Sequence, residues 1–480
     1  MASHGRAGDS SKPFEIEESQ QDMPKLAGSV VKYPARASFV WYFGLIAVGA
    51  LLLSHPLCRG SGAATISYLD AVFTSTSASC VTGLVVRSTE HDFSWLGQLV
   101  ILLLIQLGGI GIMTVTTFVM FHLGGRVSLR HRAVLSETLG ADARTDLKWI
   151  LRNVIAFTFL FEGAGFLVLL GRNLLDHPPV TAAWQALFHC VSAFCNAGFA
   201  LHDDSLVRYQ GDPVVNLTIC ILVVTGGIGF PVILDLWRNR HGRWRERWDR
   251  LHLHSKLMLS GTAVLLVLGT CAFLVLESDG VLHGMPYWKR PLVALFFSVT
   301  CRTAGFNTVE MASLTNAALF ISILLMAIGA GPCSTAGGFK VSTVAVLTLR
   351  AWSTFLGREN VSLARRAIPR ETVERATATA MLFSVIAVLA LTSLLVIEQS
   401  RMPHPESEGS FLDASFEVIS ALGTVGLSTG MTAELSDWGR VIVILLMFIG
   451  RLGPISVFIA LSRSERKTPL VYPAEEPLIG

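Results

Sequence analysis

The peptide "SALGTVGLSTGMT", residues 420–432, carries no charge and lies between two long apolar segments. Its glycines and small hydroxyl residues weaken any continuous helix at this place. If the flanking segments cross a membrane, the peptide lies at membrane depth, where non-helical backbone is tolerated only when protein buries it or water fills a cavity beside it. The peptide therefore predicts a membrane protein whose irregular segments line an internal path.

The composition agrees with a bilayer location. Of the 480 residues, 51% are hydrophobic and only 15% are charged, which is more apolar than an ordinary soluble domain. Glu162 and Arg451 each lie as the single charge inside an apolar run, at residues 153–171 and 441–462. Six further runs have no charge and can cross ~30 Å of hydrocarbon at ~1.5 Å per residue: 37–58, 93–121, 213–234, 257–276, 311–339 and 376–397. We therefore expect eight spanning helices.

The ends of the chain differ from these runs. Residues 1–36 mix basic and acidic residues with Ser and Gln and lack a short apolar core with a cleavage site, so they predict a polar cytosolic tail and not a signal peptide. Residues 463–480 predict a second cytosolic tail. The eight cysteines contain no CxxC pair and lie mostly in apolar surroundings, which favours buried small side chains over disulfides or metal ligation.

The loops alternate in basic content, which indicates their side of the membrane. Basic residues gather in loops that stay in the cytoplasm, so both termini are expected inside and the chain is expected to be multi-pass. The stretch 238–250 favours lipid headgroups or an acidic partner over nucleic acid, because it lies beside a helix end. The basic loops hold Arg126, Arg130, Arg132, Arg144 and Lys148; Arg238, Arg240, Arg243, Arg245, Arg247, Arg250 and Lys256; and Arg350, Arg358, Arg365, Arg366 and Arg370.

Four stretches between pairs of expected spans resemble one another: "FTSTSASCVTGLVV" (73–86), "FHCVSAFCNAGFAL" (188–201), "FSVTCRTAGFNTVE" (297–310) and "FEVISALGTVGLST" (416–429). Each is an apolar segment too short to cross, followed by small or hydroxyl residues and a glycine, namely Gly83, Gly198, Gly305 and Gly426. The repeating unit is helix, short re-entrant helix, glycine turn and helix. It predicts an all-α membrane protein of four membrane-pore-membrane repeats, at 37–123, 148–237, 255–350 and 371–462, around one pseudo-fourfold pore.

Such a unit is suited to a cation. A short helix that ends within the membrane directs its carbonyl end inward, and a glycine with positive φ lets the next carbonyls turn toward the axis. Four units would build a cage of oxygens for a dehydrated ion. The alternative for any one glycine is helix packing, because small residues are common at membrane helix interfaces.

These repeats resemble the selectivity-filter loops of the Trk/Ktr/HKT superfamily of potassium transporters, most specifically in "RTAGFNT" (302–308) and "SALGTVGLSTG" (420–430). The resemblance covers roughly residues 37–462, and eight spans look more like the KtrB branch than like TrkH. It implies K⁺ uptake through backbone carbonyls, and glycine rather than serine at Gly83 is associated with potassium selectivity. The implied filter residues are Thr82, Gly83, Ala197, Gly198, Ala304, Gly305, Val425 and Gly426.

A second irregular stretch, "GAGPCSTAGGFK" (329–340), interrupts a long apolar segment with glycines and Pro332. It resembles the intramembrane gating loop of the family, and the alternative is a kinked helix without a moving part. Arg451 resembles the arginine that the family places beside this loop as an electrostatic barrier; the alternative is snorkelling to the interface. The implied gate residues are Gly329, Gly331, Ser334, Thr335, Gly337, Gly338 and Arg451.

For Glu162, Arg302 and two glycine patterns we expect structural roles and no direct role in transport. Glu162 is expected to pair with a neighbouring helix or to face the interface, and Arg302 to brace the third filter loop from behind. The patterns "LGGIG" (107–111) and "TGGIG" (225–229) lack the strand and third glycine of a dinucleotide site, so they indicate close packing or hinges.

The sequence thus predicts a potassium uptake protein and not an enzyme, in the plasma membrane and, in bacteria, the inner membrane. No cofactor is expected in this chain; K⁺ is the transported ion, with Na⁺ as a candidate activator. The resemblance implies a homodimer that contacts lipid and binds a KtrA-like cytosolic nucleotide-binding ring, and no nucleic acid is expected. The alternatives are a TrkH-like or sodium-coupled variant and, from another class, a secondary transporter of an organic solute, which would show an inverted repeat and a substrate-binding side chain.

Overall fold

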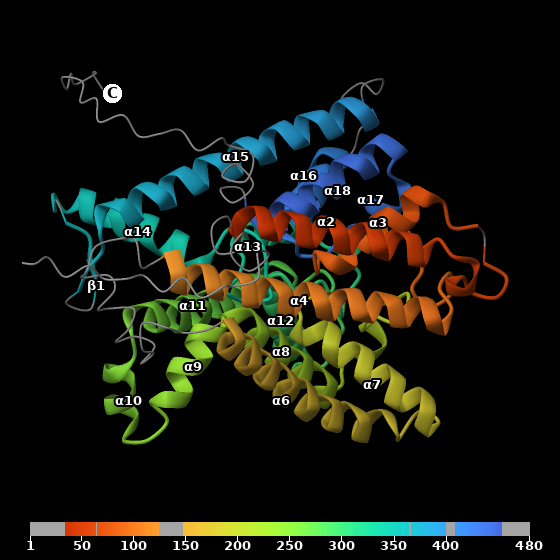
Figure 1. The fold of residues 1–480 in the computed structure, drawn as a ribbon, viewed down its shortest axis with the longest axis horizontal. Coiled ribbons are helices and arrows are strands. Elements are labelled where there is room, and N and C mark those ends of the chain that lie inside the picture. Colours follow the sequence, from red (N-terminus) through yellow and green to blue (C-terminus); the bar gives the residue numbers. More distant parts are fainter. Residues whose placement is uncertain are drawn as a thin grey trace, which may run out of the picture.

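The computed structural model describes residues 34–63, 65–123, 147–358, 360–363, 366–399 and 409–453, and these are predominantly helical (Figure 1). The expected tails, apart from residues 34–36, and the basic residues from Arg126 to Arg144 lie outside the described residues. In chain order the elements are α2 (Pro34–Leu53), η1 (Pro56–Cys58), α3 (Tyr68–Ser79), α4 (Trp95–Leu123), α6 (Leu147–Asn173), α7 (Pro179–Phe194), η3 (Val207–Tyr209), α8 (Pro213–Ile228), α9 (Phe230–Arg238), α10 (Trp244–Arg250), α11 (Leu253–Leu276), α12 (Lys289–Thr300), η4 (Met311–Ser313), α13 (Asn316–Ala327), α14 (Val341–Phe355), β1 (Ser362–Leu363), β2 (Arg366–Ala367), α15 (Arg370–Gln399), α16 (Ser410–Gly423), α17 (Met431–Glu434) and α18 (Asp437–Leu452). The strands β1 and β2 form one short antiparallel pair.

Long apolar helices make this a multi-pass membrane protein. By length and composition, four helical stretches among the described residues can cross a bilayer: Trp95–Thr114, Leu151–Asn173, Leu253–Leu276 and Arg370–Gln399. The number is five if the bent pair α8 and α9 forms one span. Eight were expected from the sequence, and the other three expected spans contain α2, α13 and α18. The first two are shorter apolar helices, and the expected span around α18 includes residues outside the described part of the chain.

The expected span at residues 213–234 is not one straight helix. It divides at Gly229 into α8 and α9, which meet at an angle of 97°. Gly229 has φ 99°, and a Cβ at this position would lie 2.5 Å from the Pro332 carbonyl oxygen. Glycine therefore permits both the bend and the close approach of the segment that contains Pro332.

The long segment that begins at Met311 also divides, as its glycines and Pro332 predict. The helix α13 ends at Ala327 and α14 begins at Val341. The backbone from Ile328 to Lys340 is non-helical, and we call it the intramembrane loop. The amide of Gly329 donates to the Phe339 carbonyl, 2.8 Å, so the two ends of the loop are held side by side.

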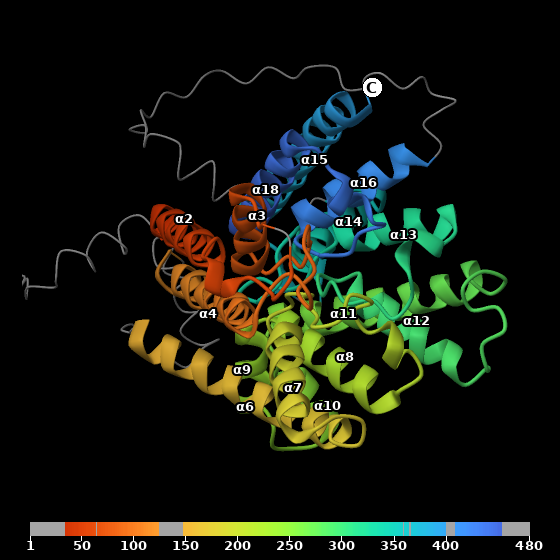
Figure 2. The same cartoon turned by 90° about the vertical axis from the view of Figure 1, so that its right-hand side faces the viewer.

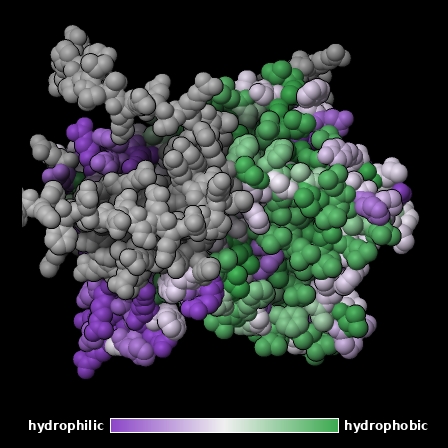
Figure 3. Space-filling model, in the orientation of Figure 1, coloured by the Kyte–Doolittle hydropathy of each residue, from purple (hydrophilic) through white to green (hydrophobic). Residues whose placement is uncertain are grey.

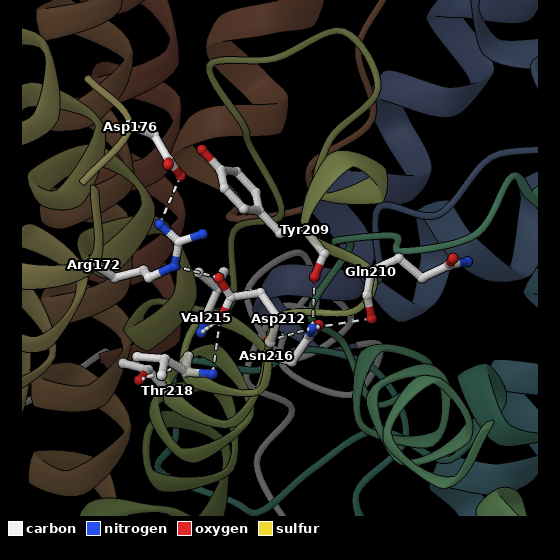
Figure 4. Close-up of polar contacts among 9 residues, drawn as sticks. Arg172, Asp176, Tyr209, Gln210, Asp212, Val215, Asn216 and Thr218 are labelled. Carbon is white, nitrogen blue, oxygen red and sulfur yellow. Dashed lines mark hydrogen bonds and ion pairs between the residues drawn. The ribbon is translucent and has the colours of Figure 1, made fainter. Parts of the chain in front are cut away.

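A polar network fixes the junction between α6 and α8. Asp212 caps α8 by accepting from the amides of Val214, 2.9 Å, and Val215, 3.2 Å, and its other oxygen accepts from Arg172 at the end of α6. Arg172 also pairs with Asp176, 2.6 Å (Figure 4). The first turn of α8 is thereby satisfied and tied to the preceding helix.

The surface has the apolar side chains that a membrane protein presents to lipid. Large apolar side chains such as Leu167, Val264 and Leu389 are more than half exposed, which is unfavourable in water and normal against lipid. Figure 3 shows hydrophobic residues over α2, α4 and α6, while hydrophilic residues gather at the lower left, where Figure 1 places α10. After a turn of 90°, Figure 2 shows α3, α7, α12 and α16 on different sides of the middle of the molecule, with loops between them.

Candidate functional site

The short helices α3, α7, α12 and α16 each run into a turn with the same two-part backbone pattern. A non-glycine residue has positive φ, and a glycine with positive φ follows two residues later. Non-glycine residues adopt this region rarely, so the surrounding structure must hold them there. The pairs are Val81 (φ 55°) and Gly83 (100°), Asn196 (60°) and Gly198 (71°), Thr303 (63°) and Gly305 (78°), and Thr424 (50°) and Gly426 (92°).

The four glycines form a closed ring in chain order. A Cβ at Gly83 would lie 3.1 Å from the Gly198 Cα, one at Gly198 would lie 2.7 Å from the Gly305 Cα, and one at Gly305 would lie 3.4 Å from the Gly426 Cα. A Cβ at Gly426 would lie 3.0 Å from the Gly83 Cα, which completes the ring. The structure thus brings together residues that are more than 300 positions apart in the sequence, and leaves no room for a side chain between them.

The other members of the expected filter supply oxygen atoms to this ring. For each glycine, we consider the atoms nearest to a Cβ placed there. The nearest or second-nearest is the carbonyl oxygen of the residue just before the next glycine of the ring. The distances are 2.5 Å to the oxygen of Ala197, 2.8 Å to that of Ala304, 2.7 Å to that of Val425 and 2.1 Å to that of Thr82. All eight expected filter residues therefore lie together, and four backbone oxygens are set around the ring.

Buried hydroxyl groups hold three of these turns in a similar way, and the sequence analysis did not single them out. Ser77 Oγ accepts from the Gly83 amide, 3.1 Å, and Ser192 Oγ donates to the Phe199 carbonyl, 2.7 Å. Ser420 Oγ donates to the Leu427 carbonyl and also accepts from the Gly426 amide. Each serine precedes its glycine by six residues, a spacing that could have revealed it. In the third turn Thr300 donates to the Phe306 carbonyl and precedes Gly305 by five residues.

A cavity of about 310 Å³, which we call the vestibule, opens on one side of the ring. All four glycines line it, together with residues that follow each glycine in the chain, including Ser88, His202 and Thr432. The carboxylate of Glu417 braces this side, because it accepts from Ser428, 2.9 Å, and from Thr432. The vestibule is therefore a chamber with both polar and apolar walls that reaches the ring.

The intramembrane loop lies against the residues that precede the glycines, and so on the opposite side of the ring. Thr335 Oγ1 donates to Asn196 Oδ1, 2.7 Å, and its amide donates to the Gly226 carbonyl, 3.2 Å. A Cβ at Gly338 would lie 3.0 Å from the Gly423 carbonyl oxygen, and one at Gly337 would overlap Thr424. The loop thus contacts two of the positive-φ residues directly.

The gate residues implied by the sequence all belong to this arrangement. The Gly329 amide donates to the Phe339 carbonyl and the Gly331 amide donates to the Gly227 carbonyl, 2.8 Å each. Ser334 Oγ donates to the Gly331 carbonyl, 2.7 Å. Lys340, which was not among them, donates to the carbonyls of Ala336, 2.7 Å, and Gly337, 3.1 Å. Backbone groups of the loop are therefore largely satisfied within the membrane.

Arg451 is buried and does not reach the interface. Its guanidinium donates to the Thr335 carbonyl of the loop, to the Gly108 carbonyl of α4, 3.0 Å, and to the Tyr42 hydroxyl, 3.3 Å. An arginine at such depth costs at least ~2.5 kcal/mol on insertion scales unless it finds partners. These contacts from three segments provide the partners, and they tie the loop to α4 and α18.

Two other charges within the apolar segments do not line the vestibule. Arg302 lines a small cavity with residues of α8, α11 and α12, behind the third turn and outside the vestibule. Glu162 accepts from Gln106 Nε2, 3.1 Å, and so pairs with the neighbouring α4, as expected. The pairing of Glu162 with a neighbouring helix is therefore present, while the expected bracing of the third filter loop by Arg302 stays a prediction.

The glycine patterns within the spans serve close packing. A Cβ at Gly108 would lie 2.0 Å from the Ser79 carbonyl oxygen, and one at Gly226 would lie 1.9 Å from the Phe194 carbonyl oxygen. Each glycine therefore admits the end of a short helix, α3 or α7. The hinge expected in the second pattern is present at Gly229.

Comparison with known proteins identifies the family. A model described as TrkH, cation transport protein, matches residues 47–467. The Ktr system potassium uptake protein B of Vibrio alginolyticus is 38% identical over 441 residues, which are 92% of this chain and 93% of the relative. The protein of the same name from Bacillus subtilis (strain 168) is 35% identical over 449 residues, 93% of this chain and 97% of the relative.

A solved structure agrees at the level of the fold. The potassium transporter TrkH from Vibrio parahaemolyticus matches with a TM-score of 0.68 at 19% identity, over 93% of this chain and 87% of that chain. The names of these proteins describe transport and no enzymatic reaction, in agreement with the expectation of a non-enzyme. The family match and the two close relatives extend over most of the chain, and the protein therefore belongs to the TrkH family of cation transport proteins.

Proposed function

We propose that this protein carries K⁺ into the cell through one pore that passes the ring of Gly83, Gly198, Gly305 and Gly426. The observation that carries the proposal is the closure of this ring by glycine α-carbons and backbone oxygens. The relatives are named potassium uptake proteins, which supports K⁺ as the ion. The repeats at 37–123, 148–237, 255–350 and 371–462 would each supply one short re-entrant helix and one turn to the pore.

Selectivity would come from the backbone. The carbonyls of Thr82, Ala197, Ala304 and Val425 replace the hydration shell of the ion, while the hydroxyl groups behind the turns keep the oxygens in place. An inside-negative potential contributes ~2.3 kcal/mol per 100 mV for each entering K⁺, so transport can proceed without another energy source.

The intramembrane loop would act as the gate. It contacts Asn196 and Thr424 below the ring, and Arg451 adds a positive charge at the same place. Opening then requires the loop to leave these contacts, because a cation cannot pass a segment that is packed against the turns. A nucleotide-dependent signal would reach the loop from a partner subunit.

The proposed assembly is a homodimer in the plasma membrane with both termini in the cytosol and a KtrA-like ring on the cytosolic face. Its support is the basic residues of α9 and α10 and the name of the relatives, which describes a system and not a single protein. A sodium-coupled variant of the same pore is the alternative within the class. A secondary transporter of an organic solute is disfavoured, because backbone groups and uncharged side chains surround the ring.

Rubidium uptake in cells that lack their own K⁺ transport tests this function. We expect saturable ⁸⁶Rb⁺ uptake that K⁺ inhibits and Na⁺ inhibits poorly. A requirement for external Na⁺ would instead support the sodium-coupled variant. If membrane-inserted protein, measured by immunoblot, gives no uptake above the vector control under either condition, the proposal is wrong.

A further inference from the structure

A cluster of metal-ligating side chains lies at the outer edge of the vestibule. Glu90 and His91 belong to the loop between α3 and α4, and Asp203 belongs to the loop between α7 and α8. One ligand atom from each of the three lies within 4.8 Å of the other two. We propose that Glu90, His91 and Asp203 bind a transition-metal dication of the Zn²⁺ type, and that the bound ion obstructs the entrance to the pore.

The three side chains are already drawn together by hydrogen bonds. His91 Nε2 lies 3.4 Å from Asp203 Oδ2, and the Asp203 amide donates to Glu90 Oε2, 3.3 Å. Ser88 Oγ donates to Asp203 Oδ1 and accepts from the His91 amide, 3.0 Å. Ser88 therefore fixes both loops, so a metal would bind a largely formed site rather than gather free side chains.

The residue before Asp203 is a buried histidine whose ring packs against those of His189 and Tyr209. His202 is adjacent to Asp203 in the chain, is only 6% exposed and lines the vestibule. Neither of its ring nitrogens has a hydrogen-bond partner among the described residues. Both ring nitrogens are buried, and His202 is not among the three residues whose ligand atoms come together, so we assign the ion to Glu90, His91 and Asp203 alone.

The donor set discriminates between ions. Two ligand atoms each ~2.1 Å from a tetrahedral Zn²⁺ lie about 3.4 Å apart, which matches the separation of His91 Nε2 and Asp203 Oδ2. Imidazole with carboxylates suits Zn²⁺ and similar ions, whereas K⁺ and Mg²⁺ prefer oxygen ligands. If the cluster served only to attract monovalent cations, the imidazole of His91 would not be needed.

The blocking effect rests on the proposed function, because it presupposes that ions pass the vestibule. Asp203 and Ser88 line the same cavity as the four glycines. A dication held there would occupy the route to the ring and repel incoming cations. Binding itself does not depend on transport, which allows the two to be tested separately.

Zn²⁺ binding to the purified full chain is the first experiment. The protein is placed in lipid nanodiscs after removal of any histidine tag, and Zn²⁺ is titrated in competition with a fluorescent indicator. We expect one saturable site whose affinity falls about tenfold or more in H91A and in D203N, while H283A, which removes an exposed histidine from the loop between α11 and α12, keeps it. Equal binding by the parent, H91A and H283A overturns the site.

Inhibition of ⁸⁶Rb⁺ uptake is the second experiment, with each variant normalised to its own uptake without metal. The Zn²⁺ concentration that halves uptake should be about tenfold lower for the parent and for H283A than for H91A. Mg²⁺ at the same concentrations should inhibit none of the three proteins. Binding through His91 without any inhibition overturns the blocking role. If Zn²⁺ binds but no variant transports Rb⁺, the metal site stands and the proposed function is wrong.

Discussion

At Gly83, two separate requirements exclude a side chain. The backbone has φ 100°, which L-residues rarely adopt, and a Cβ would lie 2.5 Å from the Ala197 carbonyl oxygen. Gly62 has the same sign of φ, 85°, but no atom of the described structure lies within 4 Å of a Cβ placed there. The two glycines therefore separate the cost of the backbone conformation from the cost of crowding the ring.

We expect Gly83→Ser to weaken the preference for K⁺ over Na⁺, because the added atoms displace the oxygen of the neighbouring turn. The ratio of Rb⁺ to Na⁺ uptake measures this preference. Gly62→Ser is the matched control and should leave the ratio unchanged. Unaltered selectivity in a folded, active Gly83→Ser protein would remove Gly83 from the filter.

Residue types in the sequence predict one part of the candidate site, and they do not predict another part. The glycines could be predicted because the same residue recurs in four similar stretches. The positive-φ residues before them could not, since Val81, Asn196, Thr303 and Thr424 are not of one residue type and three of the four are β-branched. Tertiary contacts impose this conformation, for example the bond from Thr335 to Asn196.

Arg451 should restrain the intramembrane loop through its hydrogen bond to the Thr335 carbonyl. A hydrogen bond from a charged group is worth ~1.5–3 kcal/mol, and 1.4 kcal/mol changes a population tenfold. Arg451→Ala is therefore expected to raise ⁸⁶Rb⁺ flux about tenfold in the absence of a regulator. Arg451→Lys keeps the charge but loses the multiple contacts, so an intermediate flux would assign part of the barrier to charge. A flux equal to the parent in both variants would contradict the gating role.

At the scale of helices, three glycines allow the end of one helix to lie close against a neighbouring helix. A Cβ would lie 2.0 Å from the Ser79 oxygen at Gly108, 1.9 Å from the Phe194 oxygen at Gly226 and 2.1 Å from the Leu422 oxygen at Gly450. A backbone oxygen cannot move aside without moving the turn that follows it. Overpacking of this kind costs ~1–3 kcal/mol.

Gly108→Ala, Gly226→Ala and Gly450→Ala should each lower the melting temperature of the detergent-solubilised protein. Gly163→Ala and Gly171→Ala, in α6, are the controls, because no atom of the described structure lies within 4 Å of a Cβ there and alanine favours helix by ~1 kcal/mol. Thermal unfolding followed by size-exclusion chromatography gives the comparison. Equal stability in both groups would show that these helix contacts can relax.

Apolar length predicted the presence of helices more reliably than their continuity. The runs around α4, α6, α11 and α15 appear as long helices. Hydropathy did not reveal the bend at Gly229, because the residues on both sides remain apolar while the backbone turns by 97°. The break between α13 and α14 was predictable, since Pro332 and several glycines lie together in the sequence.

At the scale of the whole molecule, the ring depends on contacts that no local pattern contains. Gly426 meets Gly83, so the first and last of the similar stretches must lie side by side. The repetition predicted four equivalent turns, but their order around the ring comes only from the packed structure. The same holds for the cluster of Glu90, His91 and Asp203, whose members lie on loops far apart in the sequence.

The polar end of the molecule presents α10 away from the apolar surface (Figures 1 and 3). Arg243, Arg245 and Arg247 are fully on the surface there, and Trp244 is 79% exposed between them. Such a segment can bind an acidic protein surface or anionic lipid headgroups. We propose the KtrA-like ring of the assembly described above as the partner, with anionic lipid as the alternative.

Charge reversal of Arg243, Arg245 and Arg247 to Glu should weaken binding of the purified regulatory subunit, chiefly by slowing association. The effect should be largest at low salt, because the Debye length falls from ~30 Å at 0.01 M to ~10 Å at 0.1 M and screens exposed charges. Association rates by surface plasmon resonance on nanodiscs of neutral lipid provide the measurement, since neutral lipid removes competition from anionic headgroups. If the triple variant inserts correctly and keeps the parent association rate at both salt concentrations, α10 is not part of the docking surface and its charges serve orientation and lipid contact.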